Sequence, residues 1–141
     1  MMSKQLVVVI DSDAIIAQTN PDDALHRKTL EVSLKLISLN ARILYPASTL
    51  AEASAHIQRV LKDSISAYNV AQTVRSPAFE IVEINQDTLS LALTYFSPTS
   101  SKKNTLFDCI VAAVAEEKQA DAIFSFDNFY KKQGFKLASE L

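Results

Sequence analysis

The chain has 141 residues, of which 48% are apolar and 21% charged, and its formal net charge is −2. This composition is typical of one globular domain and excludes a disordered chain, and no apolar run is long enough to span a membrane. A mildly acidic protein also generates no strong field that would attract nucleic acid non-specifically.

Scarce residue types exclude several kinds of active site. The single glycine, Gly134, excludes Gly-rich phosphate loops and the GxSxG nucleophile elbow. One cysteine, Cys109, permits neither an intramolecular disulfide nor a thiolate zinc cage, and His26 and His56 are too few and too scattered for an imidazole site. Carboxylates remain, and they suit Mg²⁺ and Mn²⁺. Because Met1–Gln5 lacks the features of a secretory signal, we expect a cytoplasmic protein.

Predicted strands and helices alternate along the chain. The apolar run Leu6–Ile10 predicts a strand that is buried on both faces. Similar runs predict further strands at Ala41–Tyr45, Phe79–Ile84 and Ala122–Phe126, with a weak last strand near Phe135–Leu137. Helical spacing and capping signals predict helices at Ala14–Ala17, Ala24–Leu39, Thr49–Leu61, Ser64–Val74, Gln86–Phe96 and Leu106–Glu117, and a short one after Asp127. This order predicts one α/β domain over residues 1–141, a three-layer α/β/α sandwich with a mainly parallel central sheet.

The polar segment Ser97–Asn104 is the one long loop rich in helix-breaking residues. Such a loop can face a substrate, but in a compact domain it is more often a connector, which is the interpretation we adopt. The pairs Lys102-Lys103 and Lys131-Lys132 lie close in sequence to acidic residues and could contact phosphates. A solvated surface is the simpler interpretation of both pairs.

Two aspartates directly follow predicted strands. Asp11 follows Leu6–Ile10, and Asp127 follows Ala122–Phe126. Because parallel strands end at the same edge of a sheet, we expect both carboxylates at the edge where open α/β folds bind ligands. Either one alone could simply cap the next helix, but two at equivalent strand ends favour a site. Asp13 either joins this site or is an exposed acid in the first turn of the following helix.

Asp108 and Glu52 are the other candidate ligands. Asp108 lies near the start of a helix that is apolar almost all round, and a buried ionised carboxylate is costly unless it is paired, hydrogen-bonded or bound to a metal. The alternative is that Thr105–Asp108 forms a capping box. Glu52 is equally ambiguous, because Thr49–Glu52 also matches a capping box. A carboxylate in the first turn of a helix can cap that helix and still point over the sheet edge.

The four acids and their local sequences resemble the acidic motifs of PIN-domain ribonucleases. Asp11 lies in Val-Ile-Asp-Ser-Asp, Glu52 in Thr-Leu-Ala-Glu-Ala, Asp108 in Phe-Asp-Cys-Ile-Val-Ala-Ala and Asp127 in Ser-Phe-Asp-Asn-Phe. The resemblance covers the chain from residue 7 to about residue 137. It implies a metal-dependent endoribonuclease, similar to the VapC-type toxins of toxin–antitoxin pairs.

The resemblance also implies roles for particular residues. Asp11, Glu52, Asp108 and Asp127 would be the catalytic and metal-binding residues, holding one or two Mg²⁺ or Mn²⁺ ions that activate water to hydrolyse RNA. A homodimer and an antitoxin partner are implied as well. The hydroxyls of Ser12 and Ser125 match positions beside the first and fourth acids and could hydrogen-bond the carboxylates or a bound water. Asp13 stands where the family more commonly has a neutral polar residue, so we place it at the margin of the site.

Two alternatives stay open. Asp11-Ser12-Asp13 after an apolar strand is also similar to the start of haloacid-dehalogenase-type phosphatases, in which the first aspartate is phosphorylated. Ile15 stands where those enzymes usually have threonine or valine. The other alternative is a catalytically silent PIN-like module that acts by binding proteins.

Overall fold

The computed structural model describes residues 4–141 as a four-stranded parallel sheet with helices on both sides. Residues 1–3, which include most of the Met1–Gln5 segment, lie outside the described residues. The strands are β1 (Val7–Ile10), β2 (Arg42–Pro46), β3 (Glu80–Val82) and β4 (Ala122–Phe124), in the order β3-β2-β1-β4. Within the described chain, no helix is long and apolar enough to cross a membrane.

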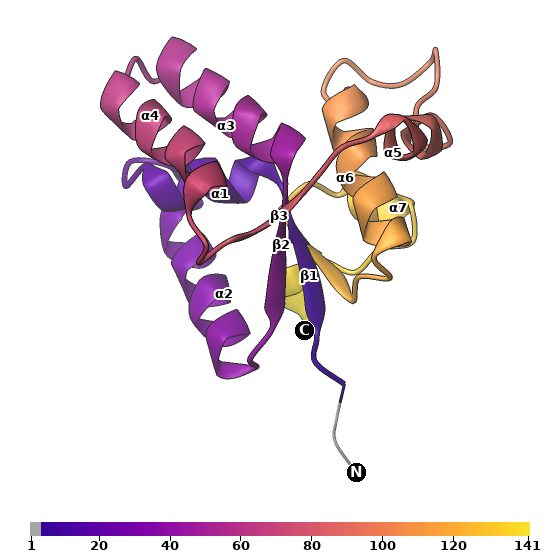
Figure 1. Cartoon of the computed structure of the whole chain (residues 1–141), viewed down its shortest axis with the longest axis horizontal. Coiled ribbons are helices and arrows are strands. Elements are labelled where there is room, and N and C mark those ends of the chain that lie inside the picture. The colour runs from indigo at the N-terminus through magenta and orange to yellow at the C-terminus, as the bar shows by residue number, and fades with distance from the viewer. Residues whose placement is uncertain (1–3) are drawn as a thin grey trace.

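The helices form the outer layers of the predicted sandwich (Figure 1). On one side of the sheet lie α1 (Ser12–Thr19), α2 (His26–Ser38), α3 (Ala47–Arg59) and α4 (Ser64–Gln72). On the other side lie α5 (Gln86–Ala92), α6 (Leu106–Glu117) and α7 (Phe129–Lys132). Two short 3-10 helices complete the chain, Thr73–Arg75 and Ala138–Glu140. The three-layer α/β/α class predicted from the sequence is confirmed.

Strand β1 divides the core into two halves because its side chains alternate between the faces of the sheet. Val7 and Val9 pack in a cluster with the buried residues of α6. Val8 and Ile10 pack in the other cluster, with buried residues of α1, α2 and α3. All four side chains are buried, as expected for a strand covered on both faces.

The strand order places a crevice at the carboxyl end of β1. The chain runs outward from β1 to β2 and β3, and then returns to form β4 on the opposite side of β1. Ile10 is paired with Phe124, so β1 and β4 end side by side. A reversal of strand order of this kind is where open α/β sheets bind ligands.

Some predicted boundaries are wrong, for identifiable reasons. Helix α3 begins at Ala47, two residues before Thr49, and its N-terminus has no side-chain cap, so the Thr49–Glu52 capping box does not form. The strand predicted to reach Phe126 ends earlier, at Phe124. The last predicted strand is reduced to one bridge, between Ile123 and Leu137.

Candidate functional site

The pairing of β1 with β4 brings the first and last predicted ligands to one edge of the sheet. The backbone N–H of Asp11 donates to the carbonyl of Phe124 at 3.0 Å, which extends the ladder by one residue. Ser125 follows Phe124 directly, and Asp127 lies two residues after Ser125. Asp11 and Asp127 therefore lie at the same strand-end crevice, as the sequence predicted.

Asp11 is the most deeply buried of the candidate ligands, with 3% of its surface exposed. Its Oδ1 accepts the backbone N–H of Ser12 at 2.7 Å, and its Oδ2 accepts the hydroxyl of Tyr130 at 2.6 Å. Burial raises its pKa well above the usual value, and the charges of Asp13 and Asp108 raise it further. Asp11 is thus the N-cap of α1 and a buried acid beside other acids at once.

Asp13 lies among these acids and is not exposed, so the alternative of an exposed acid in the first turn of the helix is wrong. Its Oδ2 accepts the Ser125 hydroxyl at 3.0 Å and the backbone N–H of Phe126 at 2.9 Å. Burial is the main cause that raises the pKa of Asp13, and the charge of Asp127 raises it further. The cause is tertiary: the first turn of α1 packs against the end of β4, so a first-turn acid points inward.

Asp108 and Asp127 are joined by an amide side chain. Asn104 donates from Nδ2 to Oδ2 of Asp127 at 2.9 Å and, more weakly, to Oδ2 of Asp108 at 3.5 Å. The predicted capping box at Thr105 is confirmed, since its N–H donates to Asp108 at 2.9 Å. Burial raises the pKa of Asp108, and the charge of Asp127 raises it further. Capping and membership of the acidic site therefore coexist at Asp108.

Glu52 projects from α3 toward the same acids. Its Oε1 is buried and has no hydrogen-bond partner. Burial raises the pKa of Glu52, a hydrogen bond with Ser12 opposes that rise, and the charges of Asp108 and Asp13 add to it. Because the capping box is absent, capping does not explain this partly buried carboxylate.

These five residues form what we call the acid cluster: Asp11, Asp13, Glu52, Asp108 and Asp127. The two ion pairs found in residues 4–141, Arg42–Glu80 and Lys131–Glu140, include none of its members. The charges of neighbouring acids add to the raised pKa values of Asp11, Asp13, Glu52 and Asp108.

A divalent cation fits the acid cluster in charge and in donor type, because hard cations prefer carboxylate oxygens. The unpartnered Oε1 of Glu52 supports this fit. Within residues 4–141, however, no three Asp, Glu, His or Cys side chains converge as a ready set of ligands. The carboxylates are turned toward protein donors, so metal binding would require some of them to rotate toward a common point.

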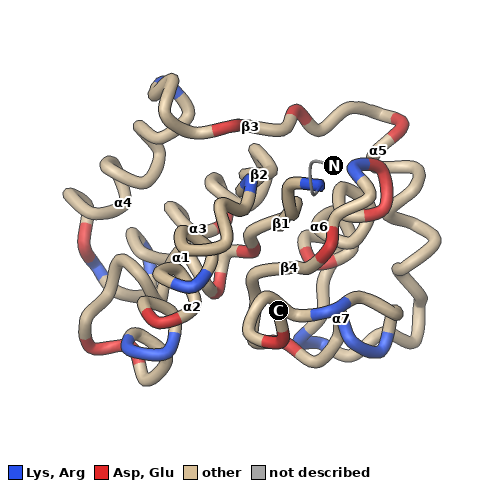
Figure 2. The backbone as a smooth tube through the Cα atoms, turned by 90° about the horizontal axis from the view of Figure 1, so that it is seen from below, with Lys and Arg blue, Asp and Glu red and all other residues tan. Residues whose placement is uncertain are grey.

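A polar hollow of about 560 Å³ lies beside the acid cluster and is bordered by the Ser97–Asn104 loop. The loop contributes Ser97, Lys103 and Asn104 to its lining, so the connector interpretation is incomplete: the loop also borders the site. Asp127 and Lys132 also line it, and Figure 2 shows basic positions in and beside α7.

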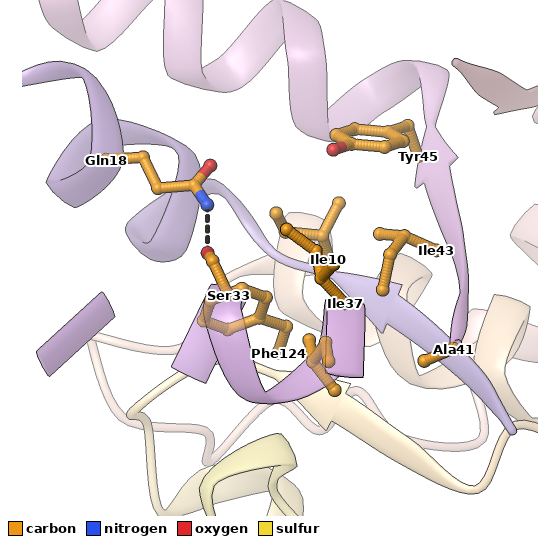
Figure 3. Close-up of a pocket in the computed structure, with 9 residues that line it drawn as sticks. Ile10, Gln18, Ser33, Ile37, Ala41, Ile43, Tyr45 and Phe124 are labelled. Atoms are coloured by element: carbon orange, nitrogen blue, oxygen red, sulfur yellow. Dashed lines mark hydrogen bonds between the residues drawn. The ribbon is translucent and has the colours of Figure 1, made fainter. Parts of the chain in front are cut away.

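A second cavity lies away from the acids, between the sheet and α1 and α2 (Figure 3). Its volume is about 170 Å³, and its walls are largely apolar, with Ile10, Ile43 and Phe124 projecting from three strands. A hydrogen bond from Gln18 to Ser33 crosses its rim. No acid lines this cavity, so it is separate from the acid cluster.

Two residues of the site were missed by the sequence analysis. Tyr130 was overlooked because a Phe-Tyr pair after Asp127 suggests only core packing. The sequence feature that could have indicated Tyr130 is that a buried tyrosine hydroxyl needs a hydrogen-bond partner, and Asp127 lies three residues before this tyrosine. Asn104 closes a polar loop, and nothing local distinguishes it from a surface amide.

The comparisons with known proteins agree with this geometry. The model of the PIN domain family matches residues 8–136. No curated protein sequence matches the chain. Among solved structures, VapC20 of Mycobacterium tuberculosis, a sarcin–ricin loop cleaving toxin, has a TM-score of 0.79 at 17% identity, covering 91% of this chain and 95% of that one.

Two further solved structures share the fold. FitAcB of Neisseria gonorrhoeae has a TM-score of 0.66 at 14% identity, covering 92% of this chain and 95% of that one. VapBC2 of Rickettsia felis, bound to a DNA fragment from its promoter, has a TM-score of 0.65 at 14% identity, covering 94% and 97%. The likeness to these structures concerns the fold, whereas the family model spans most of the sequence. The chain therefore belongs to the PIN domain family.

Proposed function

We propose that this protein is a Mg²⁺- or Mn²⁺-dependent endoribonuclease and the toxin of a toxin–antitoxin pair. The observation that carries the proposal is the acid cluster itself. Five carboxylates lie near one another at the strand-end crevice, four of them with raised pKa values, and no described Lys or Arg forms an ion pair with them. An uncompensated cluster of this kind costs stability, which is expected where function requires it.

Asp11, Glu52, Asp108 and Asp127 would hold one or two Mg²⁺ or Mn²⁺ ions. Such an ion, when bound, supplies a water of lowered pKa and neutralises charge on the scissile phosphate. The chain's own contribution is to place the ligands: Asn104 holds Asp127, and the Thr105 N–H holds Asp108. Asp13 fixes the end of β4 through Ser125 and Phe126 rather than acting as a fifth ligand.

The hollow beside Asp127 is the part of the surface that suits an RNA strand. Lys103 and Lys132 line it and can contact phosphates, and the partly buried rings of Phe126 and Phe129 also line it. The overall charge of −2 makes this local arrangement more important than the field of the whole protein.

Exposed apolar side chains support a protein partner. On α4, Ile65 is 77% exposed and Tyr68 is 62% exposed, and residues three apart share one helix face. On α2, Leu34 and Ile37 are 67% and 74% exposed. Exposed apolar groups of this size mark interaction surfaces. An antitoxin and a second copy of the chain are the partners we infer from the likeness to VapC-type toxins.

The test is cleavage of RNA by the purified chain, followed on gels with added Mn²⁺, added Mg²⁺ or EDTA. We expect cleavage with either metal, none with EDTA, and at least a hundredfold loss in Asp108→Asn, because that variant removes one ligand charge. Asp87→Asn, an exposed change on α5, is the matched control. Hydrolysis of an aryl phosphate without action on RNA, or protein binding without any cleavage, would contradict the proposal.

A further inference from the structure

Tyr130 is the buried polar residue of the site that neither the family's motifs nor the proposed metal ligands account for. Its side chain is fully buried, with 0% exposed, and its ring packs in the hydrophobic cluster that contains the buried face of α6. Phe129 packs against that ring edge-on, with the centroids 5.3 Å apart. The ring is therefore held in place, and the hydroxyl cannot swing out to solvent.

The hydroxyl of Tyr130 reaches the centre of the acid cluster. It donates to Oδ2 of Asp11 at 2.6 Å, while the backbone N–H of Ser12 binds Oδ1 of the same carboxylate at 2.7 Å. Burial and the charges of Asp11 and Asp108 raise the pKa of Tyr130 well above its usual value, so it remains a donor.

Both carboxylate oxygens of Asp11 are thus held by hydrogen bonds, and both still have free lone pairs. A carboxylate has about four lone-pair sites, and these two hydrogen bonds occupy two of them. A cation can share Asp11 without breaking the hydrogen bond from Tyr130. Partners that orient a ligand in this way typically contribute about 10–100-fold to metal affinity.

We propose that Tyr130 is a positioning residue that orients Asp11 for metal binding and keeps its hydrogen bond to Oδ2 when the metal is bound. This inference rests on the proposed function, because it requires that Asp11 be a metal ligand. It adds a determinant of metal affinity outside the set of four acids.

The experiment compares Mn²⁺ binding by the wild-type chain, Tyr130→Phe and Tyr95→Phe, using isothermal titration calorimetry at one pH. Tyr95 is the matched control, because its hydroxyl also donates to a carboxylate, that of Glu116, which is not a member of the acid cluster. We expect Tyr130→Phe to bind Mn²⁺ about tenfold more weakly or worse, and Tyr95→Phe to bind as the wild type does.

A thermal melt without metal separates positioning from support of the fold. A purely structural Tyr130 would lower the melting temperature of Tyr130→Phe and leave the Mn²⁺ affinity of the folded protein unchanged. Equal or tighter Mn²⁺ binding by Tyr130→Phe therefore overturns this inference and leaves the proposed function standing. Absence of Mn²⁺ binding in the wild type would overturn the proposed function and this inference together.

A second measurement uses the wild-type chain and does not depend on how the variant folds. The buried Tyr130 hydroxyl proton should give a slowly exchanging NMR resonance that persists when the protein is saturated with diamagnetic Mg²⁺. Loss of that resonance on Mg²⁺ binding would show that the ion displaces the hydroxyl, and would overturn the inference.

Discussion

Replacing Asp11 by asparagine removes one buried charge from the acid cluster while the shape of the side chain is kept. Asparagine is also as good an N-cap as aspartate, so the start of α1 should survive. Asp11 is 3% exposed, and burying an ionised carboxylate costs several kcal/mol even after relaxation. Its two hydrogen bonds offset part of that cost, at about 1.5–3 kcal/mol each for a charged acceptor.

The magnitude follows from these opposing contributions. Asparagine has one acceptor oxygen, so it keeps one of the two bonds and loses about 1.5–3 kcal/mol with the other. The substitution also relieves the burial cost and the repulsion from Asp13 and Asp108. We therefore expect the free energy of unfolding of the metal-free protein to change by no more than about 1 kcal/mol, or about 4 °C in melting temperature.

The response to metal should differ far more. At 100 times its dissociation constant, Mn²⁺ stabilises a protein by about 2.7 kcal/mol, which corresponds to about 10 °C for a chain of this size. The wild-type chain should show this rise in melting temperature, and Asp11→Asn should show almost none. Thermal melts at pH 7 with and without Mn²⁺ measure both quantities, with Asp87→Asn as the control. An Asp11→Asn protein that gains as much from Mn²⁺ as the wild type would refute the reasoning.

Three further predictions concern the rest of the site. Glu52→Gln should weaken Mn²⁺ binding in a calorimetric titration without lowering the metal-free melting temperature, because Oε1 has no partner to lose. Glu117→Gln, at the exposed end of α6, is the control, and an equal loss of Mn²⁺ affinity in both variants would count against the role of Glu52. The pKa values of Asp11, Asp13, Glu52 and Asp108 are raised in the folded state. Their protonation therefore stabilises the folded protein fully below the usual pKa values of 3.8 and 4.5, and this stabilisation is lost as the pH rises through the raised pKa values. The stabilisation by Mn²⁺ should therefore grow over the same pH range, as melts across pH would show, and a Mn²⁺ effect independent of pH would contradict this. Lys103→Ala combined with Lys132→Ala should weaken RNA binding in EDTA and reduce the slope of log affinity against log salt by about 1.4, and an unchanged slope would place the RNA elsewhere.

The sequence was sufficient to predict the layers of the fold. Short continuous apolar runs of β-branched residues, such as Leu6–Ile10, are typical of strands covered on both faces, and helices separate them along the chain. The α/β/α sandwich follows from that alternation. The sequence predicted the boundaries of helices and strands less well. Helix α3, for example, begins directly after Pro46, before the capping signal at Thr49.

The candidate acids were predicted for a similar reason. Asp11 and Asp127 follow strands, and Asp108 is the one acid near the start of an apolar helix, so their unusual positions are visible in one dimension. The capping box at Asp108 formed, and its carboxylate still reached the cluster. The capping interpretation is therefore confirmed, and the role of Asp108 as a metal ligand stays a prediction.

Only the tertiary structure decided which groups meet these acids. The strand order β3-β2-β1-β4 sets β1 beside β4, and that pairing turns Asp13 inward onto Ser125. It also places the hydroxyl of Tyr130 on Asp11, across 119 residues of sequence. Local sequence reports whether a side chain is buried and in which element it lies. Its partner is set by packing between distant elements, which no local pattern records.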